Sequence, residues 1–122
     1  MVFIVPRFVQ DGLIRTELRF PHEGRIVDVY ATCGVTGSTD THLDIEKCSD
    51  TDYNETPSWS SIFSSDLFVD ANKKSSKTST NPYSLSSDVV NVDDHFRVNV
   101  VNAGEGVEDI TVEVKIEIST NV

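Results

Sequence analysis

Long apolar runs are absent from this sequence. The longest run near the N-terminus, residues 2–5, stops at Pro6 and Arg7, far short of a signal-peptide core or of the roughly 20 residues that span a bilayer. Basic residues are also few, since ten Lys and Arg stand against 20 Asp and Glu and the formal net charge is -10. Such a charge repels phosphate groups. We therefore expect a soluble, untargeted protein with no nucleic-acid partner and no membrane insertion.

Sequence motifs of catalysis and of cofactor binding are missing as well. No Gly-x-Ser-x-Gly elbow presents a nucleophile, and no glycine-rich loop opens a helix to hold phosphate. His22, His42 and His95 are scattered, and none has a metal-ligand spacing to Cys33 or Cys48. We expect no catalytic residue, no metal ion and no cofactor, and we predict that the protein is not an enzyme.

One acidic segment resembles the start of a calcium-binding loop. Asp50, Asp52 and Asn54 have the first three ligand spacings of an EF-hand. The sixth position, however, is Glu55 instead of the glycine needed for the turn, and the twelfth is Ser61 instead of a bidentate glutamate. The pattern therefore favours an acidic, solvated loop over a calcium site.

Helical periodicity is also lacking, because no stretch of 11 or more residues keeps it. Alternation of apolar and polar residues is frequent instead and is clearest over residues 110–118. Pairs such as Asp93-Asp94 and Asp11-Gly12 mark turns between the alternating segments. We predict one domain over residues 1–122, an all-β antiparallel β-sandwich of jelly-roll type. The expected strands are residues 3–9, 14–20, 27–33, 42–46, 59–63, 67–69, 84–92, 96–100 and 110–118.

Two of these expectations concern strand neighbours. Pro6 cannot donate a ladder hydrogen bond, so the first strand is predicted at a sheet edge. Residues 26–33 and 41–47 are predicted to form a hairpin around the turn at 34–40. In such a hairpin Cys33 and Cys48 lie on the order of 20 Å apart, too far for a disulfide, so both thiols are expected to remain reduced.

A polar, serine-rich segment at about residues 71–88 interrupts the strand pattern. It carries Lys73, Lys74 and Lys77, three of the ten basic residues. We predict a long solvated loop that is most mobile over residues 72–79, because no apolar residue there can anchor it. The alternative is a loop that contacts a partner.

Three aromatic residues suggest a sugar-binding platform. Trp59, Tyr53 and Tyr83 lie near Asp, Asn and Ser in the sequence, and aromatic faces pack on sugar C–H groups while acids and amides bind hydroxyls. The alternative for Trp59 is simple packing at the margin of the sandwich.

Several segments, in order, resemble a β-sandwich module of tailed-bacteriophage tail and baseplate proteins, which occurs in receptor-binding and tail-tip proteins. The resemblance covers about residues 13–118, nearly the whole chain. It differs at Cys48, where a polar turn residue is expected, and in an inserted acidic stretch at 49–57. The segments that carry it are residues 19–29, 43–47, 61–63 and 94–100.

This resemblance implies a structural or adhesive role without catalysis. It implies a virion component of the tail tip or baseplate that is made in the bacterial host cytoplasm and contributes to host adsorption. The partners that it implies are copies of the same chain, most often in a trimer, other phage tail proteins and a host cell-surface glycan. A free-standing carbohydrate-binding module using Trp59, Tyr53 and Tyr83 is the alternative.

Overall fold

The computed structural model describes residues 1–119, which form eleven strands and one short helix. All strand pairings within these residues are antiparallel. The prediction of an all-β, antiparallel, single-domain fold is therefore confirmed. The elements are β1 (Val2–Phe8), β2 (Gly12–Phe20), β3 (Gly24–Val35), β4 (Thr41–Cys48), α1 (Asp50–Asn54), β5 (Ser60–Ser61), β6 (Phe63–Ser65), β7 (Leu67–Val69), β8 (Ser84–Leu85), β9 (Val89–Val90), β10 (Asp94–Asn102) and β11 (Glu108–Ile118).

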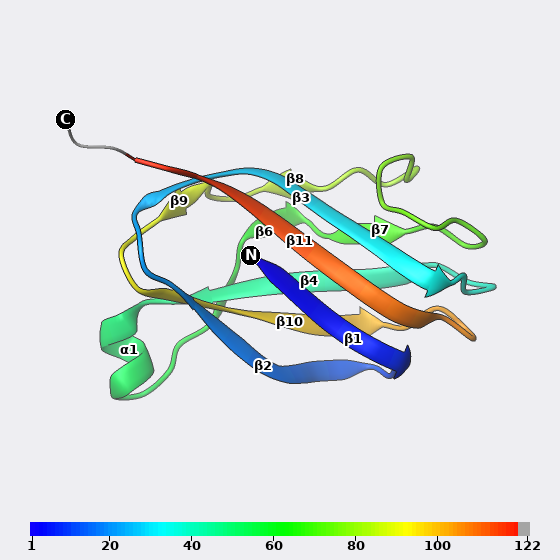
Figure 1. Cartoon of the computed structure of the whole chain (residues 1–122), viewed down its shortest axis with the longest axis horizontal. Coiled ribbons are helices and arrows are strands. Elements are labelled where there is room, and N and C mark those ends of the chain that lie inside the picture. Colours follow the sequence, from blue (N-terminus) through cyan, green and yellow to red (C-terminus); the bar gives the residue numbers. More distant parts are fainter. Residues whose placement is uncertain (120–122) are drawn as a thin grey trace.

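Two sheets face each other as a β-sandwich (Figure 1). Sheet A has the strand order β1-β11-β3-β9, and sheet B has the order β2-β10-β4-β5, with β7 also paired to β4. From β1 to β4, every connection takes the chain from one sheet to the other. The connections from β9 to β10 and from β10 to β11 do the same. A small third sheet of β6 and β8 belongs to the segment that runs from sheet B back to sheet A.

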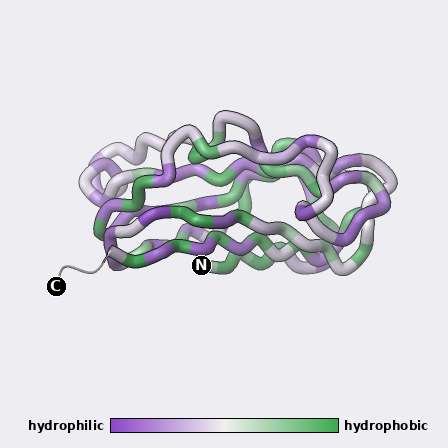
Figure 2. The backbone as a smooth tube through the Cα atoms, turned by 90° about the horizontal axis from the view of Figure 1, so that it is seen from above, coloured by the Kyte–Doolittle hydropathy of each residue, from purple (hydrophilic) through white to green (hydrophobic). Residues whose placement is uncertain are grey.

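The core lies between the two sheets, where the period-two alternation places every second side chain. In β11, Ile110, Val112 and Val114 are at most 1% exposed, whereas Glu113 between them points to solvent. Phe96 of β10 is fully buried in the same core. Figure 2 shows the two layers edge-on, with hydrophobic and hydrophilic positions alternating along the strands.

The outermost strands on one side of the sandwich, β1 and β2, are both irregular. β1 is at the edge of sheet A, as Pro6 predicts, and its register with β11 shifts between Val5 and Phe8, where Arg7 has a φ of 60°. β2 is at the edge of sheet B, and its register shifts where it passes Val98 of β10. Such irregularities hinder edge-to-edge pairing with another chain.

The predicted hairpin between β3 and β4 is wrong. β3 pairs with β11 and β9 in sheet A, whereas β4 pairs with β10, β5 and β7 in sheet B. Cys33 and Cys48 therefore lie in different sheets, where both are buried free thiols. Burial raises the pKa of the Cys33 thiol, which behaves as a small apolar side chain.

Two predicted strands are divided, and one helix was not foreseen. The segment 59–63 contributes to β5 and β6, and the segment 84–92 contributes to β8 and β9. Helix α1 occupies the acidic stretch after β4, where the Ser49 side chain accepts a hydrogen bond from the backbone N–H of Asp52. Five residues are too few to produce a visible helical period.

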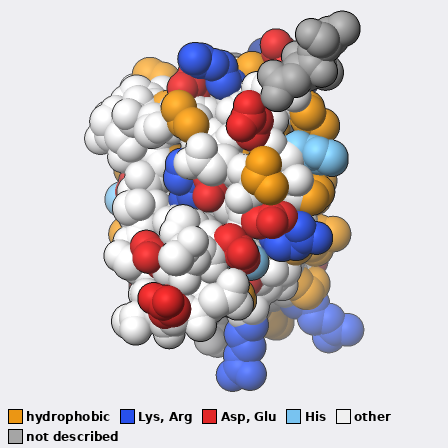
Figure 3. Space-filling view, turned by 90° about the vertical axis from the view of Figure 1, so that its left-hand side faces the viewer, with side chains coloured by type: hydrophobic (Ala, Val, Ile, Leu, Met, Phe, Trp, Pro, Cys, Tyr) orange, Lys and Arg blue, Asp and Glu red, His pale blue; other side chains and the backbone are white. Residues whose placement is uncertain are grey.

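The end of the sandwich that carries α1 has a mainly polar surface (Figure 3). Figure 3, which views this end, shows carboxylates distributed among uncharged side chains. Within residues 1–119, no helix combines the length and the apolar composition needed to cross a bilayer.

Candidate functional site

The serine-rich segment is docked along β3, so the expectation that residues 72–79 lack an anchor is wrong. The backbone N–H of Cys33 donates to the carbonyl of Lys74 at 2.9 Å, and the N–H of Ser76 donates to the carbonyl of Ala31 at 2.9 Å. The Ser76 hydroxyl accepts from the N–H of Ala31. Backbone pairing and the polar side chains of Ser76 and Lys74, whose ammonium donates to the carbonyl of Gly34, therefore supply the anchor that apolar side chains do not offer.

Asp70 fixes the next part of this segment. Its carboxylate accepts hydrogen bonds from the Ser79 hydroxyl and from the backbone N–H of Thr80, both at 2.8 Å. The bond from the Thr80 N–H is the main reason that the pKa of Asp70 lies below its usual value, and the Ser79 hydroxyl acts in the same direction. Asp70 thus contributes stability while it is ionised, which is lost as the pH falls through its lowered pKa.

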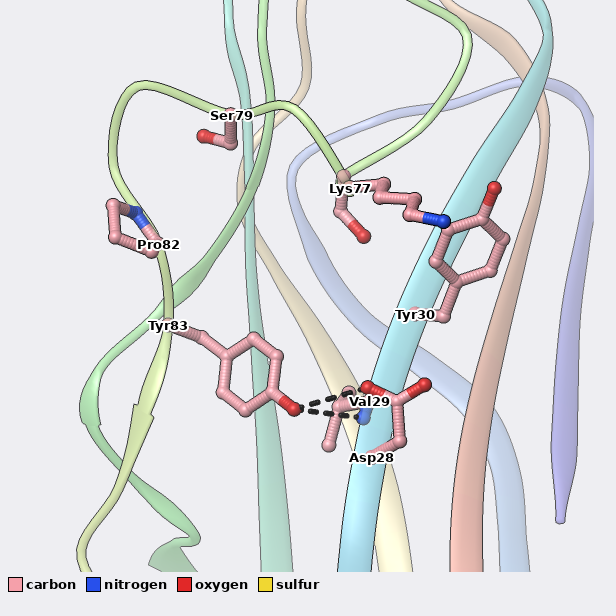
Figure 4. A pocket seen from close by; sticks show the side chains of 8 residues that line it. Asp28, Val29, Tyr30, Lys77, Ser79, Pro82 and Tyr83 are labelled. Atoms are coloured by element: carbon pink, nitrogen blue, oxygen red, sulfur yellow. Dashed lines mark hydrogen bonds between the residues drawn. The ribbon is translucent and has the colours of Figure 1, made fainter.

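A cleft of about 470 Å³ lies between β3 and the docked segment (Figure 4). Asp28 and Val29 form its lower end, and Tyr83 and Tyr30 stand on opposite sides. Lys77 reaches across the top from the docked segment. The volume falls within the range of small-molecule sites. Ser76, Ser79 and Pro82 complete the lining.

Tyr83 is held in a fixed position at the cleft wall. Its hydroxyl donates to a carboxylate oxygen of Asp28 at 3.2 Å and accepts from the N–H of Val29 at 3.1 Å. Its ring packs edge-on against the buried Phe63. Burial raises the pKa of Tyr83, and the bond to Asp28 adds to this effect, so the hydroxyl remains a donor at neutral pH.

On the opposite wall, two polar groups remain available to bind a ligand. Within residues 1–119, neither the Tyr30 hydroxyl nor the Lys77 ammonium makes a side-chain hydrogen bond or ion pair. Tyr30 is half-buried, so one part of its ring is accessible, and Lys77 is exposed. Asp28 offers a second carboxylate oxygen beside the one that Tyr83 uses. The cleft therefore combines two aromatic rings with a donor and an acceptor.

The predicted aromatic platform is divided between two places. Tyr53 and Trp59 meet edge-on over the outer face of sheet B, where Tyr53 stacks on His95 at 3.7 Å between ring centroids. The Arg97 guanidinium lies 4.2 Å from the centre of the Trp59 ring and covers it. Tyr83 belongs instead to the cleft beside β3. Trp59 and Tyr53 thus pack α1 and the following loop onto the sheet, and only Tyr83 lines the cleft.

The acidic and histidine positions singled out in the sequence serve local structure. Asp50, Asp52 and Asn54 form α1 instead of a ligand loop, and Asp50 bonds His95 at 2.9 Å. His42 bonds Asp66 at 2.7 Å and stacks on Phe68. Within residues 1–119, no three His, Cys, Asp or Glu side chains are grouped to hold a metal ion. His22 packs edge-on against Phe20.

Most of the cleft residues were not selected in the sequence. Tyr83 was selected for its side-chain type, but Asp28 and Tyr30 have no special spacing in the strand pattern. The sequence does show one signal, the concentration of serine and lysine over residues 71–88. Which strand this segment meets depends on long-range pairing, which the sequence pattern does not reveal.

Comparison of the chain with protein-family models, with curated proteins and with solved structures finds no match.

Proposed function

We propose that this chain is a structural component of a bacteriophage virion, placed at the tail tip or baseplate, where it contributes to host adsorption as a homo-oligomer. The observation that carries the proposal is the strand order. With the short β7 left out, because it pairs with β4 beside the main order, the other eight strands of the two sheets are numbered in chain order; they run one-eight-three-six in sheet A and two-seven-four-five in sheet B. We infer from this wrapping a jelly roll, an architecture used by viral shell proteins and by lectins.

Three further features support a building block over an enzyme. Buried side-chain polar atoms all have a hydrogen-bond partner within residues 1–119, as expected of a well-packed structural framework. Exposed apolar side chains occur on β1, where Ile4 is 66% and Phe8 76% exposed, and a second copy of the chain packing on this strand would cover them. The resemblance of residues 13–118 to tail modules points in the same direction.

The test is to purify virus particles from the host that makes this chain and to quantify the chain by mass spectrometry across a density gradient. The proposal predicts that the chain sediments with infectious particles at a fixed ratio to the main shell protein. Recovery only in the fractions of free protein contradicts it. A non-structural protein of the same virus, measured in the same gradient, serves as the control for carry-over.

Self-association is tested separately with the purified chain. A homo-oligomer, with a trimer as the specific expectation, gives a multiple of the 13.5 kDa chain mass in light scattering. A monomer mass over the range of about 1 to 100 μM, concentrations at which a specific interface associates, contradicts the oligomeric part of the proposal.

A free-standing carbohydrate-binding module is the second candidate, because Tyr83 lines a cleft with a second tyrosine. Saturable sugar binding by a monomer that is absent from particles favours this candidate over the virion component.

A further inference from the structure

We infer that the cleft between β3 and the docked segment binds a neutral saccharide, whose ring is held between Tyr30 and Tyr83 and whose hydroxyls bond Asp28 and Lys77. The binding itself holds for either candidate function, and only its use in host adsorption rests on the proposed function. The site differs from the platform predicted in the sequence, because it uses Tyr83 without Tyr53 and Trp59.

The chemistry of the lining selects the ligand class. The free carboxylate oxygen of Asp28 needs a donor from the ligand, whereas the Lys77 ammonium needs an acceptor. A hydroxyl satisfies either requirement, and the hydroxyls around one sugar ring offer a donor toward Asp28 at the lower end of the cleft and an acceptor toward Lys77 at its top (Figure 4). Tyr30 and Tyr83, on opposite sides of the cleft, supply apolar ring carbons against which the C–H groups of the same sugar ring pack (Figure 4).

Other ligand classes fit less well. An apolar ligand would remove the Asp28 carboxylate and the Lys77 ammonium from water without pairing them, which is costly. A phosphate or a polyanion would face the Asp28 carboxylate on a chain of net charge -10. A neutral polyhydroxylated ligand avoids both penalties.

The cleft is preorganised on the Tyr83 side. The hydrogen bonds of the Tyr83 hydroxyl to Asp28 and Val29 fix the ring before any ligand arrives. Asp70 holds Ser79 and Thr80, and so fixes the segment that carries the ring. A fixed wall lowers the entropy cost of binding. Tyr30 and Lys77 are the adaptable contacts, and their substitution removes no side-chain hydrogen bond within residues 1–119.

The experiment is an NMR titration of the ¹⁵N-labelled full chain with the methyl glycosides of glucose, galactose, mannose, rhamnose and N-acetylglucosamine, and with glucuronate as an anionic probe. We expect saturable amide shifts at residues 28–30 and 76–83 with at least one neutral glycoside below about 50 mM. Glucuronate should bind more weakly than the matching glucoside.

Matched variants test the residue assignments. Tyr30→Ala and Lys77→Ala should each weaken binding about tenfold or more, while Tyr30→Phe retains most of it because the ring remains. Lys73→Ala removes the same charge from the same segment outside the cleft lining and should leave affinity unchanged. The amide spectrum of each variant reports whether it is folded.

Three results would overturn the inference. They are the absence of saturable shifts with every neutral glycoside, shifts centred on Tyr53 and Trp59, and wild-type affinity in both Tyr30→Ala and Lys77→Ala. Tighter binding of glucuronate than of the glucoside would overturn the role of Asp28. Particle sedimentation is measured independently, so failure of the sugar site leaves the virion proposal standing, and the reverse also holds.

Discussion

Phe96→Ala is expected to destabilise the protein by about 3–5 kcal/mol, the usual cost of deleting a buried phenylalanine ring. Phe96 is fully buried in the first half of β10, which pairs with both β2 and β4. Removal of its ring leaves a cavity between the two sheets that the surrounding strands cannot close. Thermal unfolding followed by circular dichroism should show a melting temperature lower by about 10 °C or more.

Phe8→Ala is the control for this substitution. Phe8 is 76% exposed on the edge strand β1, so its loss should change the stability by no more than about 0.5 kcal/mol. Similar losses for Phe8→Ala and Phe96→Ala would contradict the assignment of the core to the space between the two sheets.

Asp94→Asn is expected to cost about 2 kcal/mol, because the half-buried Lys47 ammonium loses the buried carboxylate that balances its charge. The Asp94 side chain is 2% exposed, accepts a hydrogen bond from the backbone N–H of Asn91 at 2.8 Å and lies 3.7 Å from the Lys47 ammonium. The amide can still accept the bond from Asn91, but it no longer balances the Lys47 charge. Lys47 retains its bond to the carbonyl of Val89, which limits the loss. Urea unfolding measures the change.

Asp93→Asn is the matched control one residue earlier. Asp93 pairs with Arg19 at an exposed site, where an ion pair contributes at most about 1 kcal/mol. Asparagine also tolerates the positive φ of 66° at this position. If Asp93→Asn destabilises the protein as much as Asp94→Asn, burial is not the cause.

The alternation of apolar and polar residues was sufficient to locate the long strands. β11 and β10 each carry apolar residues at every second position over five or more residues, and both were predicted within two residues of their observed ends. The Asp93-Asp94 turn was also predicted, but not the burial of Asp94, because its environment is formed by β4. The local sequence pattern shows the periodicity of a segment, but it does not show which segments lie beside it in the fold.

Strand pairing was the main failure. β3 and β4 are joined by a short turn, and short connections favour a hairpin, yet the two strands pair instead with β11 and β10 from the far end of the chain. Both strands are apolar on one face only, so either pairing buries the same side chains. Which of the two pairings forms depends on contacts between segments that are far apart in the chain, and a single sequence does not show these contacts.

The cleft was missed for a related reason. Tyr83 could be singled out as an aromatic residue in a polar segment, but it and Lys77 join Asp28 and Tyr30 of β3 only after residues 74–76 pair with that strand. The predicted mobility of this segment assumed that apolar side chains are the only anchor. Hydrogen bonds from Cys33 and Ser76 provide another.

The proposed site depends most on the docking of residues 74–76 on β3, and hydrogen exchange measured by NMR tests this docking directly. The amides of Cys33 and Ser76 donate at 2.9 Å to carbonyls across this junction. The docked structure predicts that both exchange much more slowly than the exposed amide of Lys77, which serves as the internal reference. Exchange of Cys33 and Ser76 at the unprotected rate would show a solvated loop, and the cleft beside Tyr83 would not exist.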